Sequence, residues 1–209
     1  MRIVLLGPPG SGKGTQAVKL AAKFGVPHIS TGDILRANVR KKTKLGKLAQ
    51  STMAAGGLVP DDVVIEMTAK RLKEPDAQKG FVLDGFPRNL AQARALEGLA
   101  PLDHVVNLYL DAEDLVKRST GRRICPNCAA VYHLLTNPPK KPGRCDKCGS
   151  ELTTRTDDTE EVVRVRVKTY DEQTRPLTEH YKAKGLLRDV YASGHIEEIF
   201  HRVLEALHA

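Results

Sequence analysis

The chain lacks tryptophan altogether, and aromatic residues make up only 4% of its 209 residues. Proteins that hold single-stranded nucleic acid stack bases on aromatic rings, so this composition leaves few platforms for such a ligand. Long apolar runs are also missing. The run nearest the N-terminus, Ile3 to Leu6, is too short for a signal-peptide core or a membrane-spanning helix. We therefore expect a cytoplasmic protein.

What the chain does contain is typical of a globular protein, with 41% hydrophobic and 28% charged residues. Its length suits one main domain with room for an inserted module. The formal net charge of +8 favours anionic partners. Charge alone does not choose between nucleic acid, a membrane surface and small phosphates.

Short apolar runs alternate with segments of helical period. The expected strands are 2–6, 26–30, 81–83, 105–110 and 188–191, and the expected helical segments are 15–24, 34–58, 60–72, 90–99 and 196–207. On the first helix the expected inner face comprises Ala17, Val18, Leu20, Ala21 and Phe24. Strands that alternate with helices predict an α/β fold with a parallel sheet covered on both faces.

A glycine-rich stretch, GPPGSGKGT, follows the first expected strand and opens the first helix. Gly7 to Lys13 fit the phosphate-loop pattern, but Gly14 stands where a Ser or Thr is usual, and a hydroxyl comes only at Thr15. Glycines let backbone N–H groups turn toward an anion at a helix N-terminus. Asp84, at the end of strand 81–83, is placed to hold magnesium or its waters. With Gly14 in the hydroxyl slot, we expect nucleotide oxygens and water to be the main metal ligands.

The segment 121–158 is rich in Pro, Gly and Cys, has no helical period, and is expected to form an inserted module. It contains Cys125, Cys128, Cys145 and Cys148, two CxxC pairs separated by a spacing typical of zinc sites. Four thiolates leave no open coordination position, so the predicted metal is structural rather than catalytic. His133, between the pairs, is interpreted as an ordinary loop histidine.

Four motifs occur in order: GPPGSGKGT, STGDILR at 30–36, DGFPR at 84–88 and RTDD at 155–158. Together they resemble adenylate kinase over essentially the whole chain, and the CxxC pairs resemble the zinc-bearing lid of its long bacterial type. The resemblance implies a P-loop three-layer α/β/α fold with a central parallel five-stranded sheet, acting as a monomer. It implies a core of 1–29, 60–120 and 159–209, a nucleoside monophosphate (NMP)-binding domain of 30–59, and a zinc-binding lid of 121–158.

The implied reaction is reversible phosphoryl transfer, ATP + AMP = 2 ADP, with Mg²⁺ and one structural Zn²⁺. The ATP-binding residues carried over are Gly10, Ser11, Gly12, Lys13, Gly14, Thr15, Arg118, Arg122, Val131, Tyr132 and Gly194. Those for AMP are Thr31, Arg36, Gly57, Leu58, Val59, Gly85, Phe86, Pro87, Arg88, Gln92, Arg155 and Arg166. The expected catalytic set is Lys13, Asp84, Arg88, Arg122, Arg155 and Arg166. Phosphoryl transfer needs this positive charge more than covalent chemistry.

Some alternatives stay open at this stage. Asp157 and Asp158 are expected either to meet lid arginines or to cap the helix that follows. Another NMP kinase, acting on UMP, CMP or GMP or using GTP, is the main rival function. A nucleic-acid-binding ATPase, supported by Tyr132 and the basic cluster 40–44, is less favoured. A purely structural zinc protein leaves the glycine loop unexplained.

Overall fold

The fold is described from a computed structural model, which describes residues 1–208. Its centre is a sheet of five strands, β1 (Arg2–Leu6), β2 (His28–Ser30), β3 (Phe81–Asp84), β4 (His104–Tyr109) and β7 (Leu187–Tyr191). They lie in the order β2-β3-β1-β4-β7, and every pairing is parallel. The parallel five-stranded sheet predicted from the sequence is confirmed.

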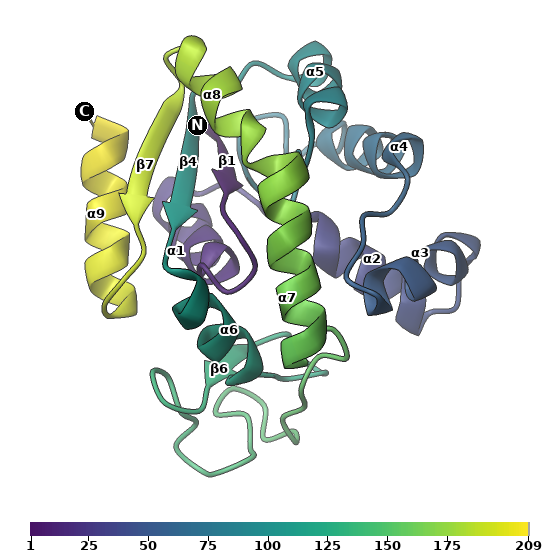
Figure 1. Cartoon of the computed structure of the whole chain (residues 1–209), viewed down its shortest axis with the longest axis vertical. Coiled ribbons are helices and arrows are strands. Elements are labelled where there is room, and N and C mark those ends of the chain that lie inside the picture. Colours follow the sequence, from purple (N-terminus) through teal and green to yellow (C-terminus); the bar gives the residue numbers. More distant parts are fainter. Residues whose placement is uncertain (209) are drawn as a thin grey trace.

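Helices cover both faces of this sheet. They are α1 (Lys13–Phe24), α2 (Thr31–Arg40), α3 (Lys44–Ala54), α4 (Asp61–Leu72), α5 (Leu90–Leu99), α6 (Ala112–Thr120), α7 (Glu160–Thr169), α8 (Pro176–Ala183) and α9 (Ile196–His208). A π-helical turn, η1 (Tyr170–Thr174), joins α7 to α8. Figure 1 shows α9 beside β7, α8 near the upper end of β1, and α7 running downward on the other side of β1.

Side chains of the buried strands point alternately to the two faces of the sheet, so helices pack on both faces and the fold has three layers. In β1, Val4 packs with β3 residues and with side chains of α4, α5 and α8. Its neighbours Ile3 and Leu5 face the other way, onto α1 and α9. Because successive strand residues point to opposite faces, a continuous apolar run is what a doubly covered strand requires.

One local prediction from the sequence, that of Val18, is wrong, and two features of the helices were not predicted. Within the segment 34–58, which was expected to be helical, α2 ends and α3 begins, because Lys42 adopts a left-handed φ of 52° and Thr43 caps α3 by accepting from Gly46 N–H. Val18 is 55% exposed and is not a core residue. The helices α6 and α8 had no predicted counterpart, since each buries only two side chains.

The segment 121–158 leaves the core after α6 and returns at α7. Figure 1 shows it as mostly irregular chain next to α6 and the start of α7. It contains a two-stranded antiparallel hairpin, β5 (Arg122–Ile124) with β6 (Val131–His133). Its own core consists of Cys125, Tyr132 and Cys145. Within residues 1–208, no helix combines the length and the apolar character needed to cross a membrane.

Candidate active site

A cleft of about 810 Å³ opens at the carboxyl ends of the central strands. The glycine loop, α1, α2, the turn after β3, the β5–β6 hairpin, α7 and the start of α9 all contribute to its walls. In an open parallel sheet, this edge is where ligands bind. The cleft therefore collects residues from every motif found in the sequence.

Close backbone contacts explain the glycines of the loop. Gly7 and Gly10 have φ values of 143° and 88°. A Cβ at Gly7 would lie 2.3 Å from the Leu108 carbonyl oxygen, and one at Gly10 would lie 2.4 Å from that of Leu115. Gly12, with φ 92°, is the N-cap of α1. The loop thus brings backbone N–H groups and a helix N-terminus to one point, as anion binding requires.

Lys13 is half-buried beside this loop. Its Nζ donates to the carbonyl oxygens of Gly7 at 2.5 Å and Pro8 at 2.8 Å. Burial, together with the smaller influence of the Arg88, Arg166 and Arg122 charges, lowers the Lys13 pKa to about 7, against the opposing influence of Asp84. An anion placed at the loop would favour the charged amine.

Asp84 ends β3 and faces Lys13 across the cleft. Burial is the largest influence on its pKa and raises it. The neighbouring His28 side chain and the charges of Lys13 and Arg88 outweigh burial and hold the Asp84 pKa below its ordinary value. The His28 Nε2 atom lies 3.7 Å from Asp84 Oδ2. Asp84 is therefore an ionised carboxylate at neutral pH, although it is buried.

Six arginines line the same space, and acidic partners hold most of them. Arg36 donates to Asp33 at 2.6 Å, Arg122 Nε to Asp158 at 2.8 Å, and Arg166 lies 3.0 Å from Asp157. Burial lowers the pKa values of Arg88 and Arg155 to about 10, so both stay charged at neutral pH. The Nε of Arg155 has no hydrogen-bond partner among the described residues.

These contacts decide between the two interpretations of the RTDD motif. Asp158 pairs with Arg122 at the start of the 121–158 segment and with Arg166 of α7. The cap of α7 is instead Thr159, which accepts a hydrogen bond from Val162 N–H. The capping interpretation is therefore wrong, because Thr159 is one residue closer to the helix.

Most of the predicted site residues lie on the cleft wall. They are Gly10, Gly12, Lys13, Gly14, Thr15, Arg36, Leu58, Asp84, Gly85, Pro87, Arg88, Arg118, Arg122, Val131, Tyr132, Arg155, Arg166 and Gly194. Ser11, Thr31, Val59, Phe86 and Gln92 are buried behind it. Gly57 is half-buried and sits next to Leu58.

Several of these residues have structural partners. Thr31 Oγ1 donates to the Gly85 carbonyl at 2.9 Å and so joins α2 to the turn after β3. Arg118 donates to the Ala192 carbonyl at 2.8 Å, close to Gly194. The Tyr132 hydroxyl points into the small 121–158 core, where it accepts from Asp146 N–H at 2.8 Å.

Sequence reasoning missed Asp33, which binds Arg36 and lies 3.7 Å from Arg155. The spacing of three residues between Asp33 and Arg36 on one helix is a signal that could have identified the pair. It also missed His28, because the Asp84 contact forms only when β2 and β3 pair. Gln16 was missed too; it lines the cleft and anchors α9 by donating to the Ile196 carbonyl at 3.1 Å.

The four cysteine sulfurs lie within 4.8 Å of one another, and all four are free thiols. The Sγ atoms are 3.3 Å apart for Cys125 and Cys148 and 3.5 Å for Cys128 and Cys145. A tetrahedron with zinc–sulfur arms of ~2.3 Å has edges of about 3.8 Å. Ala129 and Gly149, which both have a left-handed φ, follow the second cysteine of each CxxC pair, so the backbone turns in the same way after both pairs. The donor set fits a four-thiolate metal.

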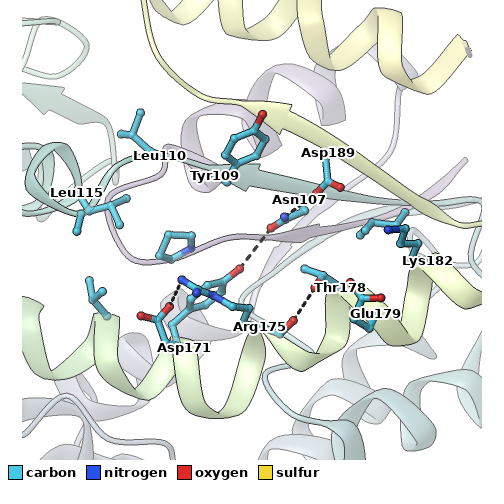
Figure 2. A pocket seen from close by; sticks show the side chains of 15 residues that line it. Asn107, Tyr109, Leu110, Leu115, Asp171, Arg175, Thr178, Glu179, Lys182 and Asp189 are labelled. Carbon is cyan, nitrogen blue, oxygen red and sulfur yellow. Dashed lines mark hydrogen bonds and ion pairs between the residues drawn. The ribbon is translucent and has the colours of Figure 1, made fainter.

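A second hollow, of about 390 Å³, lies between η1, α8 and the strands β4 and β7 (Figure 2). Its polar groups pair with one another. Asn107 donates to Asp189 at 2.7 Å, Tyr170 donates to Asn107 at 3.3 Å, and Arg175 donates to Asp171. The larger cleft, where charged groups of the glycine loop and α7 converge, is therefore the candidate active site.

Comparison with known proteins gives a consistent result. The family model described as "Adenylate kinase" matches residues 5–186. An adenylate kinase of Streptomyces coelicolor is 52% identical over 213 aligned residues, covering 99% of this chain and 98% of the relative. The chain belongs to the adenylate kinase family. Adenylate kinases of Symbiobacterium thermophilum and Archaeoglobus fulgidus are 52% and 50% identical, over 100% and 97% of this chain and 99% and 96% of theirs.

Membership in the adenylate kinase family confirms the resemblance inferred from the four ordered motifs. The chain is a nucleoside monophosphate kinase of the reaction ATP + AMP = 2 ADP, and its substrates are these nucleotides. The P-loop α/β/α fold predicted for it is the fold described above. In this adenylate kinase the cysteine cluster belongs to the segment between β5 and α7.

Proposed function

We propose that this adenylate kinase holds the ATP phosphates on Gly10 to Thr15 and the AMP phosphate between Arg36 and Arg88. One observation carries the proposal: Lys13 and the cleft arginines converge, from separate elements, on the space in front of the glycine loop. A guanidinium offers paired donors that match phosphate oxygens. An AMP phosphate oxygen held there attacks the terminal phosphate of ATP directly and in line, with no covalent enzyme intermediate.

The remaining arginines stabilise charge on the transferring group. Arg122 and Arg155 come from the 121–158 segment, and Arg166 comes from α7. In the structure they lie beside Asp33, Asp157 and Asp158, which keep them in place. We infer that the phosphates replace some of these carboxylate contacts, because both partners are oxyanions with similar hydrogen-bonding geometry.

The proposed metal partner of ATP is Mg²⁺, which would neutralise charge on the nucleotide phosphates. The ionised carboxylate of Asp84 suits the binding of its water ligands. A Cβ at Gly14 would meet Asp84 Oδ2 at 3.5 Å, so residue 14 places no side chain between the carboxylate and the loop. Thr15 follows directly and provides the nearest hydroxyl on α1.

The domain assignment is also a proposal. Residues 30–59 form the NMP-binding domain, 121–158 the lid, and 1–29, 60–120 and 159–209 the core. We propose that the lid binds one Zn²⁺ through its four cysteines, and that the enzyme is a cytoplasmic monomer. Thr31, residues 57–59, residues 85–88 and Gln92 are assigned to AMP. Val131, Tyr132 and Gly194 are assigned to the ATP base, and Arg118 is assigned to ATP.

The test is a coupled assay of ADP formation with Arg166→Ala and, as a matched control, Arg164→Ala. Both residues lie on α7, but Arg164 is 66% exposed, and within residues 1–208 its one ion pair is with Glu160, one turn earlier in the same helix. Removing a donor that acts on transition-state charge lowers kcat by about 10²–10³-fold. We expect that loss for Arg166→Ala and wild-type turnover for the control. Equal turnover of both variants, or a faster wild-type rate with UMP than with AMP, contradicts the proposal.

A further inference from the structure

Both ends of the Gln92 side-chain amide are held by other residues. Gln92 lies in the first turns of α5 and is 1% exposed. Its Nε2 donates to Asp61 Oδ1 at 2.7 Å, and its Oε1 accepts from the Arg88 backbone N–H at 2.8 Å. Asp61 comes from the first turn of α4, the helix that packs beside α5 (Figure 1). The two contacts therefore join three separate stretches of chain.

These partners fix which way the amide points. An ionised carboxylate only accepts hydrogen bonds, and a backbone N–H only donates, so the Gln92 nitrogen must face Asp61 and the oxygen must face Arg88. Flipping the amide would place two acceptors together at Asp61 and two donors together at Arg88. After these contacts, the amide keeps one N–H and one lone pair for another partner.

Asp61 itself is held in place by Asn89. The Asn89 Nδ2 donates to both Asp61 oxygens, at 2.9 and 3.0 Å, while its Oδ1 accepts from Gln92 N–H at 2.9 Å and caps α5. Asp61 is also two residues from the end of the 57–59 segment. One carboxylate thus fastens the three stretches that we assigned to AMP: 57–59, 85–88 and Gln92.

We propose that Asp61 is a positioning residue that sets acceptor-base specificity by fixing the orientation of the Gln92 amide. Adenine presents an acceptor at N1 and a donor at N6, whereas hypoxanthine presents a donor at N1 and an acceptor at O6. An amide of fixed orientation matches one of these edges and opposes the other. The inference rests on the proposed function, in which Gln92 meets the base of AMP.

The test compares kcat/KM for AMP with kcat/KM for inosine 5′-monophosphate, IMP. The variant is Asp61→Asn, whose amide offers a donor as well as an acceptor, so residue 61 no longer favours one orientation of Gln92 and only the Arg88 N–H contact remains to hold it. The matched control is Asp62→Asn, which removes a neighbouring, exposed carboxylate from the same helix turn. Asp61→Ser is a second variant, with a side chain too short to reach the amide.

We expect both Asp61 variants to lower the AMP-to-IMP ratio of kcat/KM by about tenfold. The loss should come from a higher KM for AMP, with kcat for AMP unchanged, because the transferring phosphate is untouched. The control should keep the wild-type ratio. If Asp61→Asn unfolds at a lower temperature but keeps the wild-type ratio, Asp61 is purely structural and the inference is wrong.

Gln92→Met separates this inference from the proposed function. Methionine fills similar space but has no amide. If Gln92→Met raises the KM for AMP while Asp61→Asn does not, the base contact holds and the role of Asp61 is refuted. If Gln92→Met leaves the KM for AMP unchanged, Gln92 does not meet the base, and the AMP-site assignment itself is wrong.

Discussion

Removing the metal that we propose for the 121–158 lid should destabilise this adenylate kinase substantially. The lid core contains only Cys125, Tyr132 and Cys145, and two of those three residues belong to the metal cluster. Because so little apolar surface is buried there, we expect the metal to supply the cross-link that keeps the segment folded. Cys128→Ser removes one of the four thiolates.

The magnitude follows from the loop that the metal closes. Joining Cys125 to Cys148 encloses about 24 residues, and the chain-entropy relation for a cross-link of that length gives about 3.5 kcal/mol. For a chain of about 200 residues, each kcal/mol shifts Tm by about 2–4 °C. Loss of the metal should therefore lower Tm by about 7–14 °C. Turnover at low temperature should fall less, since a four-thiolate metal has no open position for substrate.

The assay is calorimetric unfolding of the purified enzyme, with metal content measured on the same sample. Glu151→Ser is the control, because it introduces the same side chain at an exposed position of the lid outside the cluster. Wild-type protein treated with a chelator should match Cys128→Ser, and the control should match untreated wild type. A metal-free enzyme with an unchanged Tm, or native protein that contains neither zinc nor iron, would show that the cross-link reasoning is wrong.

Two further predictions concern the glycine loop. Gly10→Ala should lower the free energy of unfolding by more than Gly12→Ala. Both glycines have a left-handed φ, but a Cβ at Gly10 would lie 2.4 Å from the Leu115 carbonyl oxygen. A Cβ at Gly12 would meet no atom of residues 1–208 within 4 Å. Denaturant unfolding of both variants measures the difference, and equal losses would contradict it. As pH rises through about 7, Lys13 loses its proton in the free enzyme, so kcat/KM for ATP should fall; saturating ATP favours the charged amine, so kcat should vary less. If kcat and kcat/KM for ATP fell in parallel as the pH rises, this role of Lys13 would be contradicted.

The sequence predicted those helices and strands whose caps and apolar patterns lie within the element itself. The helix at 90–99 has the expected bounds because Asn89 caps it and Ala93 and Leu96 form its buried face. The strand at Phe81–Asp84 is buried on both faces, and its apolar run is unambiguous. By contrast, α6 buries only Leu115 and Ser119, so its sequence resembles that of a polar loop.

The motifs that line the cleft were visible in the sequence because each is a short contiguous run of residues, but the pairing among their charges was not. The Asp61 contact with Gln92 spans 31 residues and exists only because α4 and α5 begin side by side. The Arg122 contact with Asp158 spans 36 residues and closes the two ends of the lid. Such contacts depend on tertiary packing, and no periodicity along the chain encodes them.

The glycine at position 14 connects the departure from the usual loop motif with the chemistry of the cleft. A side chain at residue 14 would begin 3.5 Å from Asp84 Oδ2, so a serine or threonine there would compete for the carboxylate. With glycine, Asp84 keeps its other neighbours, His28 and Lys13, and remains ionised despite its burial. The absence of a hydroxyl at residue 14 and the position of the Asp84 carboxylate are therefore linked. The loop lacks a side-chain oxygen ligand for the metal, and Asp84 remains accessible to the metal-bound phosphates in the proposed mechanism.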